Sequence, residues 1–124
     1  MRLSQLFKLL AGEIQPEVFL DRFRLPLDEY TRGMNSVGSS VEIEVVEDRK
    51  LTIGPKEVKK LCELFVAQKL NSSQLAYIAD ALQLCESIDF TEEVVADIVE
   101  EFTDPEVNGP FTRERAQEVA AGIT

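Results

Sequence analysis

The apolar residues of this chain recur mainly three and four positions apart, which is the spacing of an amphipathic helix. This pattern predicts a first helix that ends near Gly12 and a second helix that Pro16 opens and Pro26 ends. Four more helices are predicted to begin near Pro55, Asn71, Thr91 and Thr112. The hydrophobic pattern therefore indicates a mainly helical protein.

Helix starts are marked by residues that can satisfy free backbone N–H groups. Asn71 with Gln74 three residues later resembles a capping box. Thr91 is the expected cap of the next helix, with two glutamates at its positive end. The expected core face of that helix consists of Val94, Val95, Ile98, Val99 and Phe102. Thr112 is expected to cap the last helix, whose apolar set is Ala116, Val119, Ala120 and Ile123.

One segment has the period of a strand instead. Apolar residues at 41, 43 and 45 alternate with glutamates at 42 and 44. Residues 47–50 can turn the chain and residues 51–53 can return it, which predicts a short hairpin packed against the helices. Residues 28–40 contain Gly33, Asn35, Gly38 and several serines and are expected to form a loop. We predict an α+β fold, predominantly α, with five to six helices, one small β-hairpin and a single domain over residues 1–124.

The composition removes most catalytic classes. The chain has no histidine, which is the commonest general base and metal ligand. No glycine-rich phosphate loop, nucleophile elbow or metal motif is present. Cys62 and Cys85 each lie within an apolar helical pattern and are interpreted as inert thiols. We therefore expect a protein that is not an enzyme and that holds neither a cofactor nor a metal.

No stretch of the sequence approaches the roughly 20 apolar residues that span a bilayer. The N-terminal run is interrupted by Gln5 and Lys8 and lacks a small-residue cleavage site. We interpret it as an amphipathic helix of the mature protein and expect no membrane partner and a cytoplasmic location.

The net charge of −10 lies in one part of the chain. Residues 1–69 carry eleven acids and eleven bases, and residues 113–124 carry two of each. Between Asn71 and Thr112 there are ten acids and no lysine or arginine. Nucleic acid is an unfavourable partner for such a segment, because phosphate binding requires basic side chains.

This acidic segment has two interpretations. It is either a solvated face that keeps the protein soluble or a surface that attracts a basic partner. Acids at three- and four-residue steps repel one another within a helix, so a stripe of them favours the second interpretation. The candidate partner-binding residues are Glu86, Asp89, Glu93, Asp97, Glu100, Glu101 and Asp104.

Residues 104–115 resemble a calcium loop of the EF-hand type. Asp104, Glu106, Asn108 and Gly109 occupy its first, third, fifth and sixth positions. The twelfth position, where a bidentate glutamate belongs, is Arg115. The alternative is a tight connection between two helices, which we favour over a calcium site.

The run Glu101-Phe102-Thr103-Asp104-Pro105-Glu106-Val107-Asn108-Gly109-Pro110-Phe111-Thr112 is similar to a family motif of the immunity proteins that bacteria encode beside antibacterial toxins. The chain also resembles them in type: small, acidic, helical and without catalytic motifs. The family includes the immunity proteins of contact-dependent growth inhibition systems. The resemblance implies a protein that binds one cognate toxin, here a basic toxin of the nuclease class, and inhibits it. The alternatives are a small helical adaptor or regulatory subunit and a degenerate calcium module.

Overall fold

The computed structural model describes residues 1–21, 45–103 and 112–122. Helices make up 64% of these residues, which confirms the predicted α+β class with mostly helices. The described elements are α1 (Leu3–Leu10), α2 (Pro16–Asp21), β1 (Leu51–Ile53), α4 (Pro55–Val66), α5 (Ser72–Leu84), β2 (Ile88–Phe90), α6 (Glu93–Glu101) and α8 (Arg113–Gly122). The loop predicted over 28–40, the strand residues 41–44 and residues 104–111 of the calcium-like loop lie outside the described ranges.

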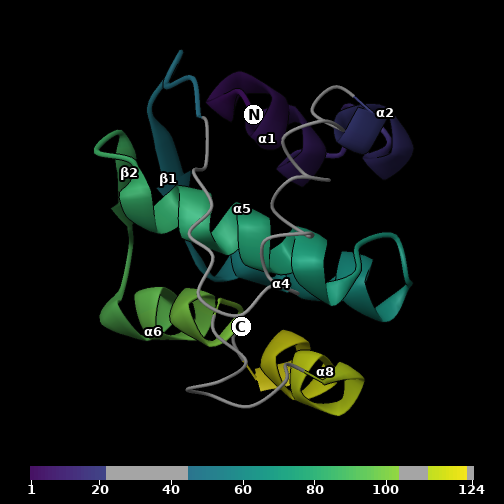
Figure 1. The fold of residues 1–124 in the computed structure, drawn as a ribbon. Helices are drawn as coiled ribbons and strands as arrows, with labels where there is room; N and C mark the ends of the chain where they lie inside the picture. The colour runs from purple at the N-terminus through teal and green to yellow at the C-terminus, as the bar shows by residue number, and fades with distance from the viewer. Residues whose placement is uncertain (22–44, 104–111, 123–124) are drawn as a thin grey trace, which may run out of the picture.

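Helices α4 and α5 form the centre of the molecule (Figure 1). Helix α4 packs against α1, α5, α6, α8 and β1. Helix α5 is buried on most of its surface, because most of its residues are apolar. Its buried residues are small alanines and larger side chains such as Leu75, Tyr77 and Ile78. In Figure 1 the α1–α2 pair lies on one side of these two helices and the α6–α8 pair lies on the other. Within the described part of the chain, no helix has the length and apolar character needed to cross a membrane.

The two strands pair in parallel, so the predicted hairpin is wrong for β1. Leu51, Thr52 and Ile53 lie opposite Ile88, Asp89 and Phe90 in register. Parallel strands need a long crossover connection, and here α4 and α5 supply it. Residues 51–53 form a strand, as the predicted hairpin required, but the partner of this strand lies 37 residues further along the chain.

The segment that was expected to turn the hairpin packs on α1 instead. Val46 forms a parallel bridge with Arg2, through hydrogen bonds to Met1 and Leu3. The Asp48 carboxylate accepts hydrogen bonds from the Ser4 backbone N–H at 2.9 Å and from the Ser4 hydroxyl at 2.6 Å.

These hydrogen bonds lower the pKa of Asp48. The N-cap residue of α1 makes no capping bond with its own side chain, so Asp48 satisfies an N–H group that would otherwise lack a partner.

Two of the three predicted caps are confirmed. Asn71 and Gln74 exchange two backbone–side-chain hydrogen bonds of 2.8 Å, and the Thr112 hydroxyl accepts from the Arg115 N–H at 3.1 Å. Thr91 is not the N-cap of α6, which is Glu92. The Thr91 N–H donates to the Ile53 carbonyl and extends the strand pairing by one residue.

Thr91 also packs against Gly54, where a Cβ would lie 3.2 Å from the threonine Oγ1. The starts of α4 and α6 therefore lie side by side at the carboxyl edge of the sheet.

Candidate binding surface

The exposed side of α6 carries a stripe of carboxylates. Glu93, Asp97 and Glu100 are all exposed and follow one another at steps of four and three residues. On the opposite side, Val95 and Val99 are buried in the core. None of the three acids forms an ion pair with another described residue. We call these three residues the acidic face of α6.

The other predicted partner-binding residues have different positions. Glu86 is exposed in the turn before β2, and Asp89 is exposed on β2 between Ile88 and Phe90. Both residues precede α6 along the chain, in and beside β2, so they carry negative charge that lies outside the acidic face of α6. Asp104 lies outside the described residues.

Glu101 is directed toward α8 and is neutralised there. Its two carboxylate oxygens accept hydrogen bonds from Arg115 Nε at 3.0 Å and from Arg115 Nη2 at 2.9 Å. A third guanidinium nitrogen donates to Glu118 at 3.2 Å. The hydrogen bonds that Arg115 donates to Glu101 and Glu118 raise its pKa above its ordinary value. Arg115 therefore stays charged and joins α6 to α8.

This pair could not be predicted from the sequence, because Arg115 follows Glu101 by 14 residues and the intervening segment contains further acids. The count of ten acids without a base between residues 71 and 112 is correct, but folding brings a base from outside that segment to one of them. Within the predicted stripe, Glu101 is therefore ion-paired with Arg115. The acidic face of α6 has no such partner among the described residues.

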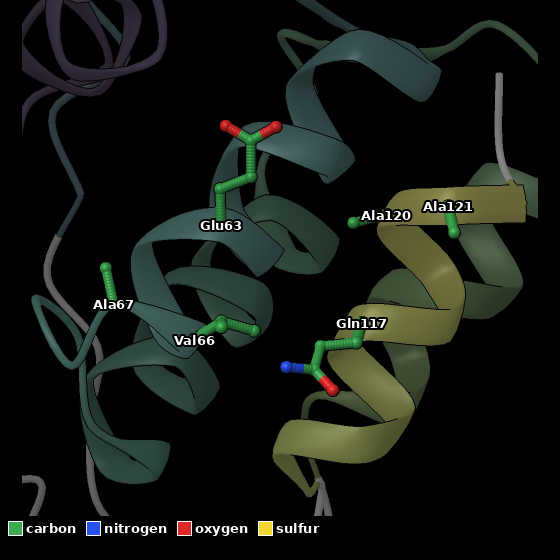
Figure 2. Close-up of a pocket in the computed structure, with 6 residues that line it drawn as sticks. All are labelled: Glu63, Val66, Ala67, Gln117, Ala120 and Ala121. Atoms are coloured by element: carbon green, nitrogen blue, oxygen red, sulfur yellow. The ribbon is translucent and has the colours of Figure 1, made fainter.

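A groove of about 430 Å³ lies between α4 and α8 (Figure 2). In Figure 2, Val66 of α4 and Gln117 of α8 point toward one another across it, and Glu63 points outward at its edge. The remaining lining residues are Ala67, Ala120 and Ala121. The groove is therefore lined mainly by small and apolar side chains.

A second hollow of about 340 Å³ lies on the other side of α8, toward α6. Val94 and Ile98 of α6 and Val119 of α8 supply its apolar lining, and Glu92 and Glu118 are among its polar residues. Val94 was expected in the core but is 50% exposed. The helix begins one residue later than predicted, and Val94 faces this hollow instead of the interior.

The two cysteines are free thiols, as expected. Cys62 is fully buried in α4, and this burial raises its pKa to about 12. Cys85 is half-buried at the end of α5, where burial also raises the pKa. Both thiols are therefore protonated and unreactive at neutral pH.

The described residues include no group of three or more cysteine or acidic side chains arranged to hold a metal ion. Of the calcium-like loop, the described part is residues 112–115, and Arg115 at its twelfth position is bound to two carboxylates. We compared the chain with protein-family models, with curated proteins and with solved structures, and none of them matches.

Proposed function

We propose that this chain is a binding protein of the immunity class, which neutralises a basic toxin, of the nuclease class, by docking it on the acidic face of α6. The observation that carries the proposal is the uncompensated stripe of Glu93, Asp97 and Glu100 on one exposed side of a short helix. Like charges at these spacings weaken the helix. A role in binding a basic partner accounts for this unfavourable arrangement, because the same charges speed association and select the partner.

Such a protein needs no catalytic group of its own. A nuclease presents positive charge where it binds phosphate, and exposed carboxylates on a rigid helix match that charge. The proposal assigns the chain a cytoplasmic role as an inhibitor without enzymatic activity.

The decisive experiment is capture with the tagged protein from the bacterium of origin, at low and at high salt. We expect recovery of a basic toxin domain at low salt, with nuclease activity that the added chain abolishes. Association should slow as salt rises, because exposed charges are screened. Recovery of housekeeping proteins alone at both salt concentrations would contradict the proposal.

Charge reversal then tests the surface itself. Asp97→Lys with Glu100→Lys changes the net charge by +4, and we expect toxin association to slow at least tenfold. The matched control is Glu13→Lys with Glu17→Lys, which makes the same change at the α1–α2 end, opposite α6 in Figure 1. Glu17 loses an exposed ion pair with Lys69 and a hydrogen bond from its own backbone N–H. If both variants slowed toxin association equally, α6 would act only through the net charge of the protein and would not be the docking site.

The α4–α8 groove favours a second candidate function, that of a helical adaptor. An apolar groove between two helices suits the apolar side of an amphipathic helix from a partner. This candidate predicts binding that is insensitive to salt. It also predicts that Ala67→Glu with Ala121→Glu abolishes capture, whereas the α6 charge reversal leaves capture unchanged.

A further inference from the structure

The hollow between α6 and α8 combines an apolar interior with negative charge at its opening. Ile98 and Val119 are buried at 8% and 4% exposure, and they form its floor. Val94, which is half exposed, adds an aliphatic wall. Glu92 and Glu118 are exposed at the opening. An aliphatic floor and acidic rim are the complement of a side chain with an apolar stem and a positive end.

The charge balance of the hollow leaves room for one more cation. Arg115 lines the hollow, but its three guanidinium nitrogens already donate to Glu101 and Glu118. Glu92 and Glu118 line the hollow and Glu101 is bound to Arg115, so three carboxylates stand against one guanidinium. Two negative charges therefore remain uncompensated among these four groups.

We infer that this hollow binds one long cationic side chain, an arginine or a lysine, that projects from a protein partner. The stem of such a side chain packs on Val94, Ile98 and Val119, while its charged end reaches the rim carboxylates. The volume is near the lower end of the roughly 300–1,000 Å³ typical of ligand pockets, which suits one side chain. A carboxylate side chain is repelled by the rim, and a short or purely apolar one leaves the rim charges unpaired.

For the identity of the partner, this inference rests on the proposed function. The hollow adds a short-range contact, an anchor for one side chain, to the long-range attraction of the acidic face of α6. The hollow and the acidic face share helix α6, on which Val94 lies next to Glu93. The acidic face attracts the basic partner, and the hollow then fixes one of its side chains in a partly desolvated position.

The anchor is tested without any toxin by methyl NMR. The probe is N-acetyl-arginine methylamide at millimolar concentration, and the control is N-acetyl-norleucine methylamide, which keeps an apolar stem but has no charge. We expect saturable shifts confined to the methyl groups of Val94, Ile98 and Val119, with at least tenfold weaker binding of the control. Equal binding of the two compounds, or no saturable shift with either, would overturn the inference.

Two conservative variants sharpen the test. Glu92→Gln with Glu118→Gln removes the rim charge and keeps side-chain size, and Val94→Thr keeps shape but makes the wall polar. We expect the first variant to weaken probe binding about tenfold, because hydrogen bonds to charged groups are lost, and the second to weaken it less. Circular dichroism checks that both variants are folded.

The two proposals fail in different ways. If the arginine probe binds but no basic toxin is captured, the proposed function is contradicted and the hollow stands. If a toxin is captured and neutralised equally well by the Glu92→Gln, Glu118→Gln variant, the hollow is not the anchor and the proposed function stands.

Discussion

Helix α8 has two neighbours, and its contacts with them use different chemistry. Toward α4 it presents the small apolar side chains of Ala116 and Ala120, one helical turn apart, and the groove of about 430 Å³ opens beside them. Toward α6 it is joined by the guanidinium of Arg115, which bridges Glu101 and Glu118 across a partly open hollow. We call these the apolar flank and the ion-paired flank of α8.

The difference shows how stability and partner recognition are divided between the flanks. Burial of apolar surface on the apolar flank contributes free energy that does not depend on salt. The ion pair on the other flank is partly exposed, at 43% for the arginine side chain and 34% for that of Glu101. A pair in this environment fixes the relative position of two helices more than it stabilises them. The ion-paired flank can thus keep an accessible hollow.

The largest change in the free energy of unfolding is expected from placing a larger side chain in the apolar flank. Ala116 is fully buried, and Ala116→Leu forces a larger side chain into closely packed surroundings. We expect a loss of about 1–3 kcal/mol in the free energy of unfolding, measured by urea denaturation. Ala121→Leu is the matched control, because Ala121 is exposed in the groove and should change stability little. Equal effects of the two variants would show that α8 is not held by its buried alanine side.

Alkaline pH offers a second way to weaken the core around α4, which contains the buried Cys62. Burial raises the pKa of Cys62 to about 12, above an ordinary value near 9, so the folded state favours the protonated thiol. The resulting stabilisation is complete below pH 9 and is lost as the pH rises toward 12. We expect a loss of roughly 1.4 kcal/mol for each pH unit above 9 from this group.

The measurement is the free energy of unfolding between pH 8 and 11 for the wild type and for Cys62→Ala. Other groups also titrate in this range, so the informative quantity is the difference between the two slopes. A Cys62→Ala variant with the same pH slope as the wild type would contradict a buried, protonated thiol.

The smallest effects are expected on the ion-paired flank. Glu101→Gln should cost about 1 kcal/mol at low salt, and less at high salt, because the pair is bidentate but partly exposed. Glu118, whose side chain is 68% exposed, accepts a single hydrogen bond from Arg115, so Glu118→Gln should cost a few tenths of a kcal/mol. A double-mutant cycle of each glutamate with Arg115→Gln isolates the pair energies. A coupling energy for Glu101 as large as the Ala116→Leu effect would reverse the assignment of roles to the two flanks.

Hydrophobic periodicity and local capping chemistry were sufficient to predict much of the fold. The helices, the Asn71–Gln74 capping box and the Thr112 cap depend on residues three or four positions apart, so their physics is local. The exposure of Glu93, Asp97 and Glu100 also follows from helical periodicity once the opposite side is apolar.

Tertiary structure alone decided the features that depend on distant partners. β1 pairs with a strand 37 residues away because α4 and α5 carry the chain back in parallel. Asp48 satisfies the start of α1 across 44 residues, and Arg115 neutralises Glu101 across 14. The two grooves beside α8 lie where it meets α4 and α6, which are far from it in sequence. The sequence by itself determined which residues form helices and where the negative charge lies. Which carboxylates stay uncompensated was decided by packing, because an ion pair needs two charges brought together in space.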